Sequence, residues 1–326
     1  MDSYRENNSI NYSLLKNIAT DPKQVIAKYD ISDKNGVKRG DLLDLMFSDP
    51  DSFGNKYTYF NGEVPTATTL ELANRTVTYV IENNIQSIDN KLVLEIVRAN
   101  KYYPDNWKDD TIIGKFDTPL FWDYVNFQIK LGDKLMIEKE LYDEIEQAYQ
   151  TILTHQHTAH IFDEEKRELI YQNPIYTELS VDGTSYGVKA LPDVISIDHK
   201  NKIIYPYDFK MLTGYTAYGF KSRFLDMKYY IQSALYTFCI RQWAKEKYKG
   251  YNVVNYKFIV ISNKNLKLPL IYDPYKFVQT GFTGFDEDGK SYPGIHQLIK
   301  DLMWHRANNK WQYRRELYET NGEIKL

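Results

Sequence analysis

Hydrophobic residues recur every three or four positions through most of residues 1–165, and this spacing predicts amphipathic helices. The segment 133–155 shows it most clearly, with six apolar side chains near one helix face: Leu135, Ile137, Leu141, Ile145, Ala148 and Ile152. Near the start, Ser13 is expected to cap one helix and Pro22 to open another. Further helices are expected over residues 40–47, 68–83 and 89–99.

After residue 173 the pattern changes from a helical period to alternation, which predicts strands. Residues 174–181 form one expected strand, and the Asp182-Gly183 pair that follows is a hairpin signal. Residues 185–197 and 202–212 are two more expected strands, so that three antiparallel strands would form a meander. Three further elements complete the pattern: a long helix over 220–246, a buried strand over 255–262 and a basic helical tail over 294–317.

This order of elements predicts an α/β fold in which helices flank a mixed β-sheet. No clear linker divides the chain, so we expect a single elaborated domain over residues 1–326. Within it, residues 1–165 would be mostly helical, residues 166–262 would hold the α/β core, and residues 263–326 would form a basic helical extension.

Composition narrows the classes of protein that fit. The 326 residues include 41 Lys and Arg and 44 Asp and Glu, for a net charge of −3. The single cysteine, Cys239, excludes a disulfide framework, a four-cysteine zinc site and a four-cysteine iron–sulfur cluster. No stretch approaches 18 apolar residues, and residues 1–11 are polar. We therefore expect no transmembrane helix and no secretory signal, and place the chain in the cytoplasm.

Two aspartates and a lysine on the expected second and third strands carry the main chemical pattern. Pro192-Asp193 is followed, after 14 intervening residues, by Asp208-Phe209-Lys210. The two carboxylates can converge across a short hairpin on a hard cation such as Mg²⁺ or Mn²⁺. Asp208 and Lys210 point to one face of a strand, so the ammonium would lie beside the cation. There it can orient or deprotonate an attacking water and offset charge on a phosphate.

The string of an acid, any residue and a lysine is by itself uninformative. It begins at eight positions: Asp21, Asp89, Glu164, Asp198, Asp208, Asp226, Asp288 and Glu323. Asp208 differs from the others because apolar and aromatic residues precede and follow it, and charges inside an apolar strand are costly unless paired or liganded. The simpler interpretation is a buried Asp208–Lys210 ion pair that stabilises a hairpin.

The helix expected after these strands carries Gln232 and Tyr236, four residues apart on one face. An amide and a phenol there can contact a DNA backbone or steady the lysine. The spacing of 22 residues between Lys210 and Gln232 makes the pair informative.

These segments together resemble the PD-(D/E)XK nuclease superfamily, and within it the RecB/RecE-like exonuclease branch of bacteria and phages. The resemblance rests on Gly187-x₄-Pro192-Asp193, Asp208-Phe209-Lys210 and Gln232-x₃-Tyr236, and it covers residues 174–240. A weaker resemblance reaches the start through Tyr12-Ser13-x-Leu15, Asp21-Pro22 and Gly40-x₃-Asp44. Asp44 departs from the family pattern, which has a histidine at that place.

The resemblance implies a restriction-endonuclease-like core that hydrolyses DNA phosphodiesters with Mg²⁺, or with Mn²⁺ as a substitute. Asp193, Asp208 and the Phe209 carbonyl would be metal ligands, and Lys210 would position the attacking water. Gln232 and Tyr236 would complete the catalytic set.

Two further carboxylates have open roles. Asp44 is either an oxygen ligand of the metal or a solvated helix residue. Glu178 is either a second-tier ligand or an exposed strand carboxylate. The relatives that carry an iron–sulfur cluster are excluded by the single cysteine.

Positive charge gathers around the aspartate–lysine pattern, although the chain as a whole is acidic. Residues 199–250 contain ten basic and three acidic residues. Lys221, Arg223 and Lys228 flank the expected site and are candidates for contacts to DNA phosphates. The basic tail also contains Trp304 and Trp311, and a solvated basic face with tryptophans in the core is its simpler interpretation.

We therefore expect a Mg²⁺-dependent deoxyribonuclease, an exonuclease of phage-type recombination, repair or replication. Two alternatives remain: an endonuclease with the same site, and a non-catalytic DNA-binding or assembly subunit that retains the fold. DNA is the expected partner, with a recombination or single-strand-annealing protein as a further one. A ring-forming oligomer would be a route to processivity.

Overall fold

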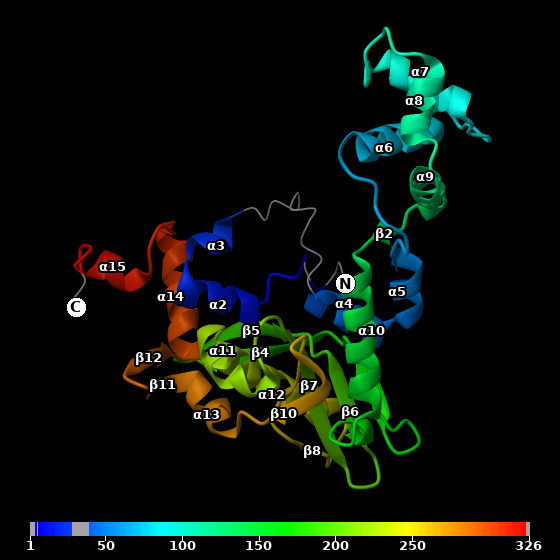
Figure 1. Cartoon of the computed structure of the whole chain (residues 1–326). Coiled ribbons are helices and arrows are strands. Elements are labelled where there is room, and N and C mark those ends of the chain that lie inside the picture. Colours follow the sequence, from blue (N-terminus) through cyan, green and yellow to red (C-terminus); the bar gives the residue numbers. More distant parts are fainter. Residues whose placement is uncertain (1–3, 5, 28–38, 324–326) are drawn as a thin grey trace. The chain divides into compact units, whose positions relative to one another are not determined.

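The computed structural model describes residues 4, 6–27 and 39–323 (Figure 1). The chain forms two compact units. Unit 1 comprises residues 1–48 and 147–326, and unit 2 comprises residues 49–146. The single elaborated domain stays a prediction, because compactness alone does not show whether either unit folds by itself.

A mixed β-sheet forms the centre of unit 1. Its strands lie in the order β10, β9, β7, β6, β3, and the short β8 pairs with the start of β7. Strand β7 is parallel to β8 and β9 and antiparallel to β6, which confirms the predicted α/β fold with a mixed sheet flanked by helices. Its six strands within the described residues are β3 (Glu168–Tyr171), β6 (Val194–Asp198), β7 (Ile203–Leu212), β8 (Asn252–Val253), β9 (Lys257–Ser262) and β10 (Asn265–Tyr272).

The strand expected over residues 185–197 is in fact two strands that belong to different sheets. β4 (Ile175–Val181) and β5 (Thr184–Ala190) form a separate hairpin, whose turn residues Asp182 and Gly183 both have positive φ. β6 begins only at Val194, because the intervening Pro192 has no N–H to donate to a strand partner. The predicted three-stranded meander is therefore wrong, and two hairpins, β4–β5 and β6–β7, take its place.

The chain before the first long helix extends the β4–β5 hairpin. Ile10 forms a parallel bridge with Val188 and donates its N–H to the Gly187 carbonyl at 2.8 Å. A Cβ at Gly187 would lie 3.1 Å from Ser9 Oγ, so the glycine allows this close approach. Helix α2 (Tyr12–Thr20) follows, and its N-cap is Asn11, not the predicted Ser13.

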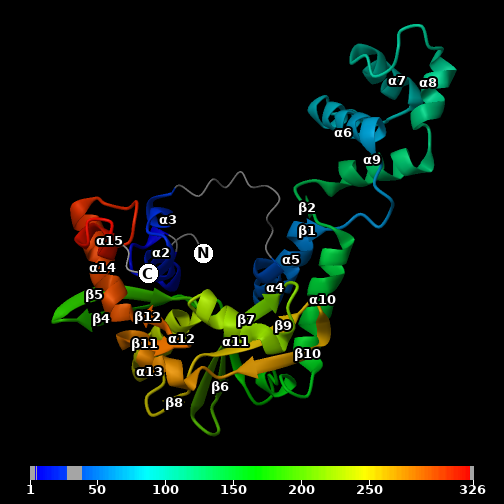
Figure 2. The ribbon, with the colours of Figure 1, turned by 60° about the vertical axis from the view of Figure 1, so that its left-hand side comes forward.

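The helices of unit 1 pack around the sheet and the hairpin (Figure 2). α12 (Tyr229–Lys247) packs against the β4–β5 hairpin and α13 (Tyr275–Thr283), and α14 (Ile295–Asn308) lies beside α2. α4 (Arg39–Ser48) packs on β7, where the Phe47 and Phe209 rings stack at 4.1 Å between centroids. The remaining elements are α3 (Lys23–Ile26), η1 (Ala159–Ile161), η2 (Ala217–Gly219), β11 (Gly284–Glu287), β12 (Lys290–Pro293) and α15 (Arg315–Glu319).

The long helix expected over residues 220–246 is interrupted. α11 (Phe220–Asp226) ends before Lys228, which adopts the left-handed conformation with a φ of 60°. No glycine or proline marks this break, so the local sequence contains no signal for it. The break redirects the chain so that Tyr229, the first residue of α12, lies beside Lys210.

Unit 2 is mostly helical and has a core of its own. Two-residue strands, β1 (Tyr57–Thr58) and β2 (Leu135–Met136), pair in parallel. The predicted helix over 133–155 begins only at Lys139, since β2 takes its first residues. The helices are α5 (Pro50–Lys56), α6 (Ala67–Glu82), α7 (Asn90–Ala99), α8 (Asp109–Phe116), α9 (Pro119–Leu131) and α10 (Lys139–Thr154), and α10 continues into unit 1.

The core of unit 2 consists of fully buried aliphatic and aromatic side chains from α6 to α9, among them Leu72, Val93, Ile112, Phe116 and Phe121. In the part of the chain that the structure describes, no helix is both long and apolar enough to cross a membrane.

The contact between α12 and α13 depends on a glycine. A Cβ at Gly281 would lie 2.7 Å from the Ala234 Cβ and 3.0 Å from the Tyr230 carbonyl oxygen, and neither atom can move freely. We expect Gly281→Ala to lower the free energy of unfolding by about 1–3 kcal/mol. In the control Gly40→Ala, the new Cβ has no neighbour within 4 Å, so this variant should be neutral or slightly stabilising. Urea unfolding would compare them, and equal stability of the two variants would contradict the tight packing.

Candidate active site

The β6–β7 hairpin brings the two predicted aspartates together. Val194 pairs with Tyr207, and this register places Asp193, directly before β6, across from Asp208 on β7. Asp208 is 2% exposed. Alternation along β7 points Asp208 and Lys210 to one face of the sheet and Phe209 to the other, where α4 covers it.

Asp208 is held by three partners from separate elements. Its Oδ1 accepts hydrogen bonds from Gln232 Nε2 on α12 and, at 3.0 Å, from the hydroxyl of Tyr256 before β9. Its Oδ2 forms an ion pair with Lys210. A carboxylate at this depth is stabilised only because each oxygen faces a donor or a cation.

Lys210 lies between aromatic rings as well as beside its carboxylate. Its Nζ lies 5.0 Å from the centre of the Tyr229 ring and 5.9 Å from that of Phe258. Burial lowers the pKa of Lys210, but the adjacent charges, Asp208 first among them, more than offset this and raise the pKa above its ordinary value. Lys210 is therefore an ammonium at neutral pH.

Asp193 is bound on both of its oxygens. Oδ2 accepts from the Phe209 backbone N–H at 2.7 Å, and Oδ1 accepts from Gln172 Nε2 at 3.0 Å. Burial, followed by repulsion from Asp208, raises the pKa of Asp193 to about 8. Two carboxylates this close in a dry environment favour either a shared proton or a cation between them.

Asp44, on α4, also lies near Asp193, Asp208 and Lys210. Its Oδ1 is shielded from solvent and has no hydrogen-bond partner. Burial raises its pKa well above the ordinary value, and the nearby Asp193 and Asp208 add to this, while Lys210 opposes it. Asp44 as a whole is half-buried, but its shielded and unpartnered Oδ1 favours the metal-ligand role over the solvated helix residue.

The donor set suits a hard cation, although the side chains are not preformed around one. Within the described residues, no three His, Cys, Asp or Glu side chains are arranged to hold a metal ion. The Asp193 carboxylate faces a backbone N–H and the Asp208 carboxylate faces Lys210. A carboxylate would therefore have to rotate before both could bind one cation. The unpartnered Oδ1 of Asp44 is a buried oxygen that a divalent cation would satisfy, and carboxylate oxygens are the ligands that Mg²⁺ prefers.

Gln232 and Tyr236, which were predicted on one helix face, make different contacts. Gln232 binds Asp208 and not Lys210, and its own Oε1 is buried without a partner. Tyr236 packs edge-on against Tyr256 with 5.0 Å between ring centres, and a side-chain hydrogen bond links it to Tyr4. Gln232 thus contacts the acidic centre directly, whereas Tyr236 supports it through Tyr256.

Glu178 is not brought to this centre. It lies on the exposed face of β4, and its Oε2 accepts from Ser185 Oγ of the paired strand at 2.7 Å. The Phe209 carbonyl, in contrast, lies at the centre and accepts a long hydrogen bond of 3.4 Å from Lys210 Nζ.

The three predicted DNA-contacting cations differ in their surroundings. Lys221 is exposed and forms an ion pair with Glu287 at 3.5 Å. Arg223 lies 6.0 Å from the Tyr215 ring centre. Lys228 is half-buried, and its Nζ lies 5.2 Å from the Tyr292 ring centre.

Sequence reasoning missed three residues of this site. Gln172, Tyr256 and Tyr229 contact Asp193, Asp208 and Lys210, respectively. Tyr229 is next to Lys228, which was singled out for its charge. Gln172 and Tyr256 belong to no motif, and only the strand pairing shows that they are close.

No family model matches the sequence, and no curated protein matches it either. Among solved structures, a "putative exonuclease" from Eubacterium rectale is similar at 13% identity and a TM-score of 0.34, over 73% of this chain and 82% of that chain. The structure of SSO0001 is similar at 9% identity and a TM-score of 0.27, over 75% of this chain and 89% of that chain. Likenesses this distant do not transfer a function, so the functional assignment depends on the geometry above.

The raised pKa of Asp193 predicts how stability varies with pH in the absence of metal. The folded carboxyl keeps its proton up to about pH 8, whereas the unfolded chain releases it near 3.8, so the folded state binds the extra proton between these values. Asp193 is therefore expected to lower the free energy of unfolding as pH rises from 5 to 8, by at most about 1.4 kcal/mol per unit, and the raised pKa of Asp44 adds a slope of the same sign.

Urea unfolding in EDTA would measure this slope. Asp193→Asn cannot titrate and should make it less steep, with Asp44 accounting for the slope that remains. A slope that is the same in the variant and the wild type would show that Asp193 is ionised throughout this range.

Proposed function

We propose that the protein is a Mg²⁺-dependent deoxyribonuclease that hydrolyses phosphodiesters, acting as an exonuclease. The observation that carries the proposal is the buried meeting of Asp193, Asp208 and Lys210 on one hairpin, with the unpartnered Asp44 oxygen beside them. A purely structural ion pair needs Asp208 and Lys210 alone. It gives no reason to bury two more carboxylates at the same point, where each repels the others.

In this proposal Asp193, Asp208, Asp44 and the Phe209 carbonyl hold the cation. Glu178 is left out because it lies on the exposed face of β4 and is bound to Ser185. When bound, Mg²⁺ supplies Lewis-acid polarisation of the phosphate and a lower pKa for an attacking water.

Lys210 acts as a fixed positive charge. Because the neighbouring carboxylates hold it as an ammonium, it donates hydrogen bonds and does not serve as a base. An ammonium here can orient a water through its N–H groups and offset the charge that develops on the phosphate. Gln232 and Tyr256 fix Asp208 by hydrogen bonds, so the carboxylate stays in place when Lys210 turns to the substrate.

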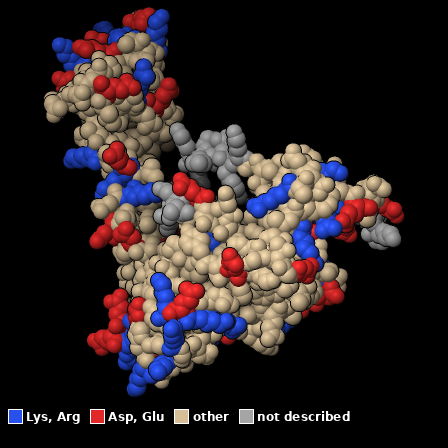
Figure 3. Space-filling view, turned by 180° about the vertical axis from the view of Figure 1, so that it is seen from behind, with Lys and Arg blue, Asp and Glu red and all other residues tan. Residues whose placement is uncertain are grey.

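The distribution of charge supports a DNA substrate at unit 1. Residues 49–146 contain 10 basic and 18 acidic residues, a net of −8, so the remaining residues of the chain carry a net of +5. Figure 3 shows basic and acidic side chains interspersed on the face it draws, so the excess does not form one continuous patch there. A modest positive excess on unit 1, which holds the site, attracts a polyanion to that unit. The acidic unit 2 does not attract it.

Cleavage assays with linear and covalently closed circular duplex DNA in Mg²⁺ test the proposal. We expect linear DNA to be degraded and the circle to stay intact. Asp208→Asn should lower the rate by about 10³-fold or more, because a ligand and the charge beside Lys210 are both lost. Glu164→Gln is the matched control, since Glu164 begins another acid-x-lysine string in unit 1 but is exposed, and it should keep full activity.

Asp208→Asn leaves Lys210 buried without its partner, so this variant could lose activity by unfolding. The double variant Asp208→Asn/Lys210→Met removes the unpaired charge, and it should fold and be inactive. Activity that survives both changes would refute the site. Nicking of the closed circle would assign an endonuclease instead.

Calorimetric titration of metal-free protein with Mn²⁺ tests the role of Asp44. We expect Asp44→Asn to weaken Mn²⁺ binding at least about tenfold. Asp41→Asn, an exposed aspartate one turn earlier on α4, is the control and should bind as the wild type does. Equal affinity in both variants would remove Asp44 from the ligand set.

A further inference from the structure

Three positively charged side chains from distant parts of the chain meet next to the candidate active site. They are Lys228 between α11 and α12, Lys290 at the start of β12, and Arg314 directly before α15. We call these three residues the basic cluster. Of the three, only Lys228 was singled out from the sequence as a DNA contact.

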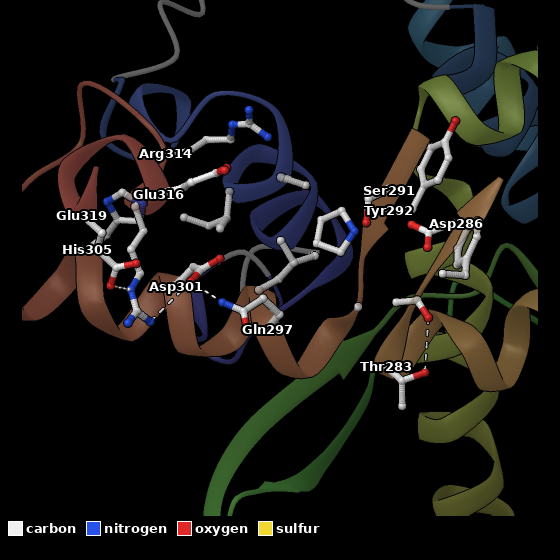
Figure 4. Close-up of a pocket in the computed structure, with 18 residues that line it drawn as sticks. Thr283, Asp286, Ser291, Tyr292, Gln297, Asp301, His305, Arg314, Glu316 and Glu319 are labelled. Atoms are coloured by element: carbon white, nitrogen blue, oxygen red, sulfur yellow. Dashed lines mark hydrogen bonds and ion pairs between the residues drawn. The ribbon is translucent and has the colours of Figure 1, made fainter. Parts of the chain in front are cut away.

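The β11–β12 hairpin brings the cluster together. Lys228 Nζ lies 5.2 Å from the centre of the Tyr292 ring, and Lys290, two residues earlier on β12, is on the same face as Tyr292. Tyr292 and Arg314 line one pocket of about 700 Å³, and Figure 4 shows them on opposite sides of it. Lys228 and Lys290 thus share the face of Tyr292 on one side of this pocket, and Arg314 lines the other side.

None of the three cations has a carboxylate partner. Within the described ranges, Lys228, Lys290 and Arg314 form no ion pair within 4 Å, whereas neighbouring cations do: Lys221 and Lys276 bind Glu287, and Arg315 binds Asp301 and Glu319. Burial lowers the pKa of Lys228; Asp226 opposes this, while Lys290 and Arg314 lower it further. Like charges held together at a half-buried position favour an anion between them.

Lys228 is also held where its backbone is strained. A lysine with a φ of 60° occupies the left-handed region, which is unfavourable for a residue with a Cβ. The hydroxyl of Tyr12 on α2 donates a 2.7 Å hydrogen bond to the carbonyl of the preceding Met227, which supports this turn. The conformation directs Lys228 to Tyr292 while the next residue, Tyr229, packs on Lys210.

We propose that the basic cluster binds a backbone phosphate of the DNA strand, adjacent to the phosphate that is hydrolysed. The inference rests on the proposed nuclease function and adds Lys290 and Arg314 as substrate-binding residues. Its position follows from the chain, because Lys228 is one residue from Tyr229, whose ring contacts the active-site lysine. Asp286 and Glu316 also line the pocket, so we place the phosphate at the three cations and not in the pocket interior.

DNA binding measured without cleavage tests the inference. Fluorescence anisotropy of an end-labelled duplex, in EDTA, would give Kd at several salt concentrations for wild type and for Lys290→Ala, Arg314→Ala and Lys228→Asn. Asparagine at position 228 tolerates the left-handed conformation, so the fold is kept. Each variant should weaken binding about 3- to 10-fold at low salt and reduce the slope of log Kd against log salt by about 0.9.

Lys300→Ala is the matched control, because Lys300 is a partly exposed cation on α14 that is already bound to Asp182. It should leave both Kd and the slope unchanged. Competition with inorganic phosphate and with a mononucleotide separates the sources of the anion: weak competition by both supports a site for a DNA strand. Displacement of the duplex by micromolar phosphate would overturn the proposal in favour of a free-phosphate site.

The DNA-binding test of the basic cluster and the cleavage test of the nuclease proposal can fail independently. If wild type binds DNA and the three cluster variants bind it with the same Kd and salt slope, the inference is wrong even if Mg²⁺-dependent cleavage is observed. If the variants weaken binding as expected but wild type never cleaves DNA, the inference stands and the nuclease proposal fails. Absence of DNA binding by wild type in EDTA would overturn the inference, while the cleavage assay in Mg²⁺ decides the nuclease proposal separately.

Discussion

The structure of unit 1 depends on placing a carboxylate and an ammonium in the middle of an apolar strand. Asp208 is 2% exposed, and the free energy of removing its charge from water is offset by one partner on its own strand and two from other parts of the chain. Gln232 on α12, Tyr256 before β9 and Lys210 on the same strand supply them. The positions of α12 and β9 are thus coupled to one side chain, and a shift in either exposes a buried charge without a partner.

The parts of the site that depend on short-range geometry could be predicted from the sequence. Asp193 and Asp208 lie across from each other at the open end of the β6–β7 hairpin, so their meeting follows from strand pairing alone. The common face of Asp208 and Lys210 follows from the alternation of a strand. Gln232 was predicted from its spacing to Tyr236 and Lys210 and from the family resemblance, and in the structure its amide donates to Asp208.

The parts that depend on distant contacts could not be predicted. Pro192 ends β5 and separates two sheets where alternation alone suggested one strand, and the missing N–H is the physical reason. The left-handed Lys228 interrupts a sequence with uniform helical propensity, because packing of Tyr229 on Lys210 and of Tyr12 on Met227 decides its backbone. Gln172 and Tyr256 are ordinary residues in their own segments and acquire a role only through the register of β3, β6 and β9.

In the proposed nuclease, Asp44 and Asp193 would have to lose their protons beside Asp208 to hold a cation, which would place negative charge next to the phosphates of the substrate. Cations paired with carboxylates do not remove this repulsion, because their charge is already neutralised. Lys210 is paired with Asp208, so attraction of a polyanion falls to cations that have no such partner. Lys228, Lys290 and Arg314 meet this condition, and Lys228 lies one residue from the ring that contacts Lys210. If both proposals hold, the strained turn at Lys228 would let one short segment support an acidic metal centre through Tyr229 and a phosphate contact through Lys228 itself.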